Sequence, residues 1–327
     1  MKLIALIFIT LLPLTSVAAQ NDHKQLDTLR AEGYEALYNL DYEGARKLFR
    51  KMIELAPDHP AGAQCLASSI WLEVLNQAWE LKATLYSTDA YTNGKTQANR
   101  SQTDEFRKWI RSAKQLSQAR LRKDPRDIEA LYFLGAAEGL DAAYAAAVEK
   151  RFTAALRSGS SSVDHHRDVL KLDPNFHDAE LTIGLLDYVV GSLPLPIKML
   201  VGTMGVRGSK KRGLQELERV SREGHWARDA ARVLLVDLYK REKRWNDGFE
   251  MARQLSEKYP RNYLFKLQMA DALVSEIVAQ RKNKTPSSVQ EKDVMNLFAA
   301  LLRDKTLDRS AVDVINYRLT ITRQQLK

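Results

Sequence analysis

The chain has 327 residues, a formal net charge of +9 and one cysteine, and 45% of its residues are apolar. These values exclude a wholly disordered chain, a low-complexity fibre and a fold held together by internal disulfides. The charge is uneven, because residues 207–327 carry a net charge of +10 whereas residues 20–206 carry −2. A basic surface leaves nucleic acid, an anionic membrane or an acidic protein as partner classes.

The first nineteen residues have the form of a secretory signal peptide. Lys2 precedes an apolar run from Leu3 to Val17, and two alanines then provide small residues for cleavage. No cysteine follows the run, so the chain lacks the site for lipid attachment. An uncleaved anchor is the alternative, but the run is short for a span of about 20 residues and Pro13 interrupts it. We expect residues 1–19 to be removed and the mature protein to be periplasmic or secreted, away from most nucleic acid.

The mature chain shows the periodicity of helices. From Lys24 onward, apolar residues recur every three or four positions, and alternating β-branched segments are nearly absent. The first unit places one helix over residues 31–38 and a second over residues 43–53, which ends before Pro57. The pattern therefore predicts an all-α chain built from helical hairpins.

Small and bulky residues mark defined places in this unit. Gly33 permits close approach on the first helix, Ala45 lies where the two helices cross, and Phe49 is the bulky residue of the second helix. Gly33 and Gly135 are 102 residues apart, which is three periods of 34. Signature residues recur later in the chain at Gly135, Gly184, Tyr239, Gly248 and Pro260.

This pattern resembles the tetratricopeptide repeat (TPR), whose period is 34 residues. The resemblance implies a right-handed superhelix of antiparallel helix pairs, a TPR-like α-solenoid, over residues 20–280. An apolar insertion interrupts it at residues 187–213, and residues 281–327 follow as a linker and a C-terminal capping helix. A generic helical bundle with accidental spacing is the alternative.

The resemblance also implies a function. TPR proteins hold peptides or protein surfaces in the groove of their stacked helix pairs, which implies scaffold or adaptor work without a cofactor. The candidate contacts on the concave side are four tyrosines, each equally suited to packing between repeats. They are Tyr34, Tyr38, Tyr188 and Tyr239.

The insertion combines an apolar segment with a basic cluster. Pro194 and Pro196 forbid a continuous helix there. We favour an insertion that packs under the superhelix, because large apolar surfaces are rarely left exposed. The alternative is an exposed element for a protein partner or an anionic membrane surface. Its candidate residues are Leu193, Leu195, Ile197, Met199, Arg207, Lys210, Lys211 and Arg212.

Chemical motifs are weak or incomplete. The glycines of residues 202–208 lack the Gly-Lys-Ser/Thr order of a phosphate-binding loop. We interpret residues 157–162 as a loop, His165 and His166 as part of a polar helix start, and Cys65 as a buried structural residue. No metal ligand set or catalytic constellation is recognisable, so we expect neither enzyme activity nor a cofactor.

The sequence therefore predicts an exported TPR-like scaffold or adaptor that binds a protein or peptide partner in the cell envelope. The alternative function is a peripheral membrane protein of the envelope that docks through residues 189–212.

Overall fold

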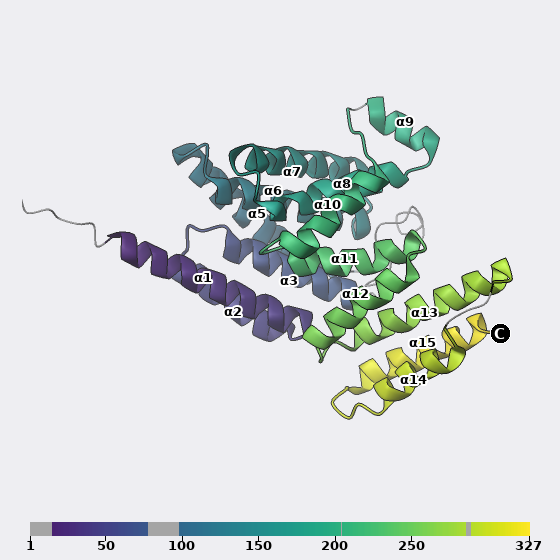
Figure 1. The fold of residues 1–327 in the computed structure, drawn as a ribbon. Coiled ribbons are helices and arrows are strands. Elements are labelled where there is room, and N and C mark those ends of the chain that lie inside the picture. Colours follow the sequence, from purple (N-terminus) through teal and green to yellow (C-terminus); the bar gives the residue numbers. More distant parts are fainter. Residues whose placement is uncertain (1–14, 78–97, 204, 286–288) are drawn as a thin grey trace, which may run out of the picture.

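The computed structural model describes residues 15–77, 98–203, 205–285 and 289–327, and over these residues it contains helices and no strand (Figure 1). The predicted all-α helical solenoid is confirmed. Residues 1–14 of the predicted signal peptide lie outside the described residues. The helices are α1 (Thr15–Tyr38), α2 (Tyr42–Leu55), α3 (Ala61–Gln77), α5 (Arg100–Lys123), α6 (Ile128–Ala147), α7 (Phe152–Leu172), η2 (His177–Ala179), α8 (Glu180–Ser192), α9 (Leu195–Thr203), α10 (Lys210–Glu223), α11 (Arg228–Arg241), α12 (Trp245–Lys258), α13 (Tyr263–Asn283), α14 (Glu291–Leu302) and α15 (Arg309–Gln325).

Consecutive helices pack as antiparallel pairs, and each pair contacts the next. The pairs are α1 with α2, α3 with α5, α6 with α7, α8 with α10 and α11 with α12. Glycine allows a close crossing between α8 and α10. A Cβ atom on Gly213 would lie 2.6 Å from the backbone nitrogen of Tyr188, and a Cβ on Gly184 would lie 2.9 Å from the carbonyl oxygen of Gly213. The two helices can pack this closely only because glycine has no side chain at either position.

Short polar side chains begin several of the helices. The Asp41 carboxylate accepts the backbone N–H of Gly44 at 2.9 Å, and Asp127 accepts that of Ala130 at 2.9 Å. Such caps satisfy backbone donors that the first helical turn leaves free. They place the starts of α2 and α6 immediately after tight turns.

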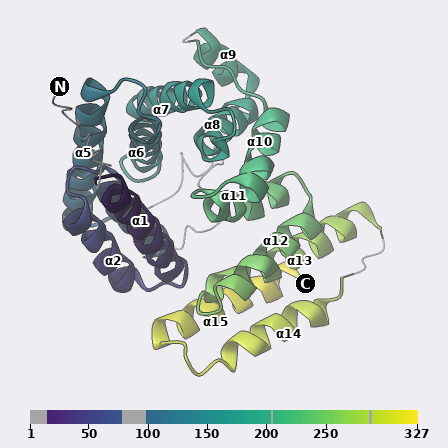
Figure 2. The same ribbon diagram turned by 60° about the vertical axis from the view of Figure 1, so that its left-hand side comes forward.

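The described helix pairs curl into a ring that brings α1 against the starts of α11 and α13 (Figure 2). Trp226 Nε1 donates to Asp27 Oδ1 at 3.1 Å, and Asn262 Nδ2 donates to the carbonyl oxygen of Tyr38 at 2.7 Å. The Tyr38 and Tyr259 rings pack with centroids 5.1 Å apart. These contacts join α1 to the segments that begin α11 and α13, and they close the concave side of the helix pairs into a ring.

Helix α7 corrects two expectations from the sequence. Residues 157–162 are helical and not a loop, and His166 lies within the helix and is buried. The serines are tolerated because α6 satisfies their hydroxyls. Ser161 Oγ donates to Glu138 Oε2 at 2.7 Å, and Ser162 Oγ donates to the carbonyl oxygen of Gly135 at 2.7 Å. Packing on α6 thus overrides the low helix propensity of serine and glycine.

The C-terminal region has more helical structure than the sequence pattern indicates. Residues 281–327, expected to form a linker and a C-terminal capping helix, contain both α14 and α15. Phe298, Leu301 and Ile315 bury their side chains in one cluster with α13. Helix α13 ends where Lys284 takes the left-handed conformation, with φ of 55°. No helix in the described part of the chain combines the length and apolarity needed to cross a bilayer.

Candidate functional site

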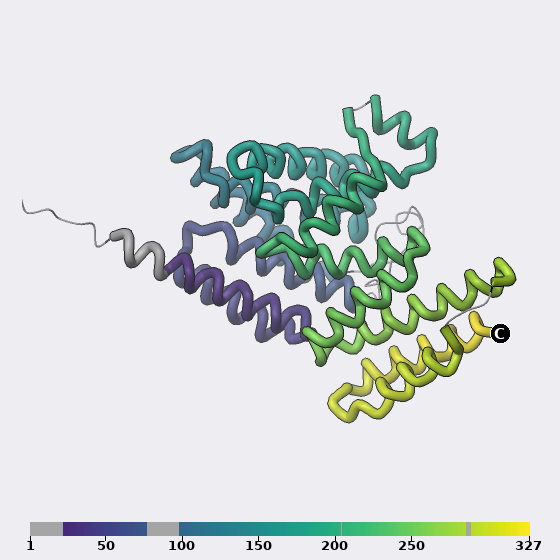
Figure 3. Tube along the Cα trace, in the orientation of Figure 1, coloured from purple at the N-terminus to yellow at the C-terminus, as the bar shows by residue number. Residues whose placement is uncertain are grey.

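Of the predicted insertion, residues 187–192 and 210–213 belong to α8 and α10 and pack within a helix pair. Helix α9 stands away from the helix pairs, so the interpretation that the insertion packs under the superhelix is wrong for this segment (Figures 1 and 3). Helix α8 ends at Ser192 because Pro194 follows, and α9 begins with Pro196 in its first turn, where a missing N–H is harmless. Leu195 and Met199 are 69% and 65% exposed. An apolar helix is therefore presented at the surface.

The two ends of the insertion meet, which explains why it projects outward. A Cβ atom on Gly208 would lie 2.6 Å from the carbonyl oxygen of Asp187 and 2.7 Å from the nitrogen of Gly191. Lys198 Nζ donates to the carbonyl oxygen of Gly191 at 3.4 Å. The chain thus leaves and rejoins the solenoid at one place, and α9 has no second anchor beneath the described helix pairs.

An apolar groove of about 450 Å³ separates α9 from the helix pairs. Ile197 and Val201 line it from α9, and Leu193 lines it from the turn before that helix. Leu195 and Met199 are not among its lining residues, so they belong to the other face of α9. The opposite wall comes from α6, α7 and α8, and its lining includes Ala142, Ala146, Leu156, Leu186 and Val189.

The basic cluster beside α9 divides into paired and unpaired side chains. Lys210 Nζ lies 2.6 Å from Glu242 Oε1, and Arg212 forms an ion pair with Asp187. Arg207 and Lys211 are exposed and form no ion pair with a carboxylate in the described residues. Two of the four predicted cations therefore have a structural partner, and two are free to meet an external anion.

The first helices of the pairs surround an inner cavity of about 210 Å³. Tyr34 and Tyr38 line this cavity, as predicted for concave contacts. Tyr188 and Tyr239 instead donate their hydroxyls to Glu242 at 2.7 Å and to Glu218 at 3.0 Å. The first pair of tyrosines thus faces the interior, and the second pair joins neighbouring helices.

Three polar residues line the cavity that the sequence did not identify as cavity residues. They are Arg30, His166 and Asp178, which are all buried. Each has charged residues near it in the sequence. The local sequence therefore does not distinguish these buried side chains from exposed ones. Trp226 also lines the cavity. It lies between α10 and α11, in a segment without a recognisable motif.

The repeat-signature residues lie at helix crossings and in turns. Ala45 and Phe49 are fully buried, and a Cβ on Gly33 would collide with the Phe49 ring. The remaining signature glycines face a neighbouring element, and the prolines follow helices. Gly135 faces the His166 ring, Gly184 packs against α10, Gly248 packs against α11, and Pro57 and Pro260 follow α2 and α12. These positions shape the helix pairs.

The described residues contain no group of three His, Cys, Asp or Glu side chains placed to hold a metal ion. Cys65 is buried, as predicted, and burial raises the pKa of its thiol. The described helices thus form two hollows, the α9 groove and the inner cavity.

No protein-family model and no curated protein matches the sequence. Among solved structures, the chain is similar to a thermophilic TPR protein of Thermus thermophilus. The TM-score is 0.42, the identity is 14%, and the match covers 77% of this chain and 99% of the other. The chain's own helices form the solenoid, because consecutive helices pack as antiparallel pairs and each pair contacts the next.

Proposed function

We propose that this chain is an exported, non-catalytic scaffold whose α9 groove holds an amphipathic, acidic helix of an envelope protein. The observation that carries the proposal is the groove of about 450 Å³ between α9 and the helix pairs. Grooves of this kind accept the apolar face of a helix through contacts spaced three and four residues apart. The signal-peptide form of residues 1–19 supports export.

The groove can bury apolar side chains of a partner but has few polar groups that could form hydrogen bonds with it. The hydroxyl of Ser162 already donates to Gly135, and that of Thr182 bonds to His166. The remaining lining is aliphatic, aromatic or glycine. Partner selection therefore needs charge outside the groove, where unpaired Arg207 and Lys211 would attract acidic side chains.

The groove also replaces the surface that a TPR protein ordinarily offers. Contacts between α1 and the segment that contains Trp226 and Asn262 bridge the two ends of the ring. A peptide could lie along the concave surface only by parting these contacts. The outer groove requires no such rearrangement, so it is the better protein-binding surface.

A photo-cross-linking residue at Ile197 tests this proposal in an envelope fraction. We expect one discrete cross-linked protein that contains an acidic amphipathic helix, and we expect a synthetic peptide of that helix to bind the purified scaffold. Ile197→Glu should abolish peptide binding, whereas Val278→Glu, at an exposed position on α13, should not. A peptide that binds wild type and Ile197→Glu equally would refute the groove assignment.

Peripheral membrane association is the second candidate, and the outer face of α9 favours it. Leu195, Met199 and Leu200 are exposed outside the groove, and free cations lie nearby at Arg207 and Lys211. Apolar side chains combined with basic ones are what an anionic interface binds.

Vesicle flotation with phosphatidylglycerol separates the two candidates. Membrane docking predicts that the mature protein floats at low salt and that Leu195→Glu or Lys211→Glu abolishes flotation, whereas Ile197→Glu acts on the groove. Lys210→Glu and Arg212→Glu are poor probes, because each also breaks an ion pair within the protein. A mature protein that stays with the soluble fraction at low salt would rule out this candidate.

A further inference from the structure

Arg30 is a buried cation without a carboxylate partner among the described residues. Its exposed fraction is 7%, and its guanidinium makes a long hydrogen bond, from Nη2 to the carbonyl oxygen of Trp226 at 3.5 Å. Its Nε has no hydrogen-bond partner within the described part of the chain. Buried arginines are almost always paired, because burial removes the hydration of the charge.

Aromatic rings hold the Arg30 side chain in place. Arg30 Cζ lies 5.1 Å from the ring centroid of Tyr34 and 4.9 Å from that of Trp226. Such contacts involve the flat faces of the guanidinium and leave its N–H groups, which lie in its plane, available for hydrogen bonds. The guanidinium lines the inner cavity of about 210 Å³, so those donors adjoin a space that a small molecule can fill.

The carboxylates of the same cavity are committed elsewhere. Asp178 accepts the backbone N–H groups of His225 at 3.1 Å and Ala227 at 2.6 Å, which fixes the start of α11. Asp237 lies 3.0 Å from Lys240 Nζ. Neither carboxylate forms an ion pair with Arg30, although the charge of Asp178 favours the charged form of the guanidinium. The N–H groups of Arg30 therefore have no carboxylate acceptor among the described residues.

We propose that the inner cavity binds a small organic monocarboxylate, with its carboxylate on Arg30 and its apolar body against the cavity wall. A guanidinium presents a fork of N–H donors that matches the two oxygens of a carboxylate. Tyr34, Tyr132 and Trp226 provide an aromatic wall for the body of the ligand. The site is separate from the α9 groove, and this inference does not depend on the proposed scaffold function.

The test uses the mature chain, residues 20–327, and calorimetric titration with phenylacetate, 3-phenylpropionate and hexanoate. We expect at least one acid to bind saturably, and its neutral amide to bind at least about tenfold more weakly, since a charge-assisted hydrogen bond is lost. Arg30→Gln should weaken binding of the acid by a similar factor. Arg46→Gln is the matched control, because Arg46 is buried but paired with Glu43 and Glu73 outside the cavity.

A second variant keeps the test decisive if Arg30→Gln unfolds the protein. Ala136→Leu leaves Arg30 in place and fills part of the cavity, so it should also weaken binding of the acid. The proposal is overturned if none of the three acids binds, if acid and amide bind equally, or if Ala136→Leu binds as wild type does. Inorganic sulfate that binds as tightly as the best acid would overturn the assignment of an organic ligand.

Discussion

Buried ionisable side chains set the electrostatic character of this protein at the residue scale. His166 contacts Thr182 through Nδ1 and the carbonyl oxygen of Tyr132 through Nε2, at 3.0 Å. Burial lowers its pKa to about 4. Glu216 on α10 behaves in the opposite way, because burial and the charge of Asp187 raise its pKa to about 7.

His166 should make the folded state less stable in acid. The folded pKa of about 4 lies below the ordinary value of 6.5, so the unfolded state binds more protons between these pH values. The stability contribution of His166 is fully present above pH 6.5 and is lost as the pH falls toward 4. We expect His166→Gln to remove a slope of up to about 1.4 kcal/mol per pH unit from the unfolding free energy in this window.

Urea denaturation at several pH values between 4 and 7 measures that slope. His165 is the matched control, because its hydrogen bond to Glu138 raises its pKa and it titrates with the opposite sign. A His166→Gln variant whose slope equals that of wild type would contradict the prediction.

Glu216 should destabilise the protein as the pH rises. Its folded pKa of about 7 exceeds the ordinary value of 4.5, so the folded state retains a proton that the unfolded state releases. Stability therefore falls between pH 4.5 and 7 on account of this group. Glu216→Gln should raise the unfolding free energy at pH 8 by about 1 to 3 kcal/mol and have little effect at pH 4. Thermal melts at both pH values check this difference, and equal effects at both would refute it.

At the scale of elements, the backbone contact between helices decides which glycines can be replaced. A Cβ on Gly213 would meet backbone atoms of Gly184 and Tyr188, which cannot move without separating α8 from α10. A Cβ on Gly159 in α7 would meet Ala142 Cβ at 3.7 Å, an ordinary contact. Both glycines lie in helices, yet only the first is required by packing.

Replacing each glycine with alanine should have opposite effects. Alanine favours a helix over glycine by about 1 kcal/mol, so Gly159→Ala should stabilise the protein by about 0.5 to 1 kcal/mol. Gly213→Ala should destabilise it by at least about 1 kcal/mol, because overpacking outweighs that gain. Chemical denaturation of both variants provides the comparison. Stabilisation by Gly213→Ala would show that the crossing is looser than the structure indicates.

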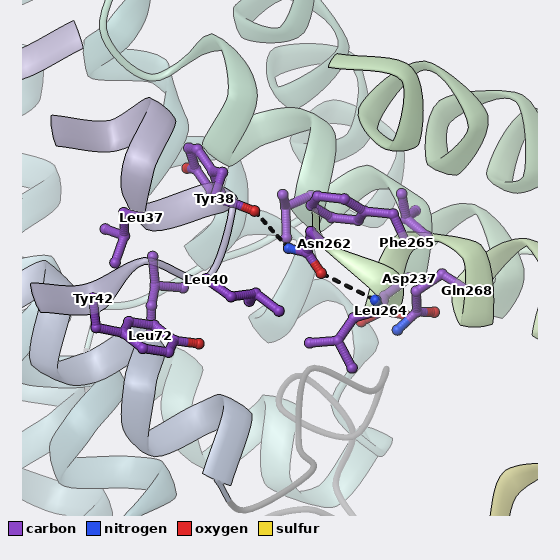
Figure 4. A pocket seen from close by; sticks show the side chains of 12 residues that line it. Leu37, Tyr38, Leu40, Tyr42, Leu72, Asp237, Asn262, Leu264, Phe265 and Gln268 are labelled. Carbon is purple, nitrogen blue, oxygen red and sulfur yellow. Dashed lines mark hydrogen bonds between the residues drawn. The ribbon is translucent and has the colours of Figure 1, made fainter. Parts of the chain in front are cut away.

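At the scale of the whole molecule, a few long-range contacts close the ring. Asn262 is central, because its side chain donates to the carbonyl oxygen of Tyr38 and accepts the backbone N–H of Leu264 at 3.1 Å (Figure 4). One side chain thus both begins α13 and attaches it to the end of α1. A small apolar pocket of about 40 Å³ adjoins this contact.

Asn262→Ala should loosen the N-terminal helix pair. The variant loses a helix cap and a buried hydrogen bond, which together cost about 1 to 3 kcal/mol. We expect faster amide hydrogen exchange in α1 and α2. Asp308→Ala is the control, because it removes the cap at Ala311 without any contact to α1. Unchanged exchange in α1 of Asn262→Ala would show that other contacts suffice to close the ring.

Helical periodicity and the 34-residue spacing sufficed to predict the all-α solenoid, because a helix that buries one face repeats its apolar residues locally. The same local information placed Cys65 in the interior. It misassigned residues 157–162, since the hydroxyls that permit a helix there are satisfied by α6, a different element.

Tertiary structure alone decided the two candidate binding surfaces. The exposure of α9 depends on Gly191 and Gly208 meeting, and the position of Arg30 depends on Trp226, which lies 196 residues away in sequence. Sequence periodicity reports which face of a helix is buried, but not which distant segment covers it. For that reason the amino-acid sequence predicts the solenoid, whereas only the tertiary structure shows that it closes into a ring with a cavity inside.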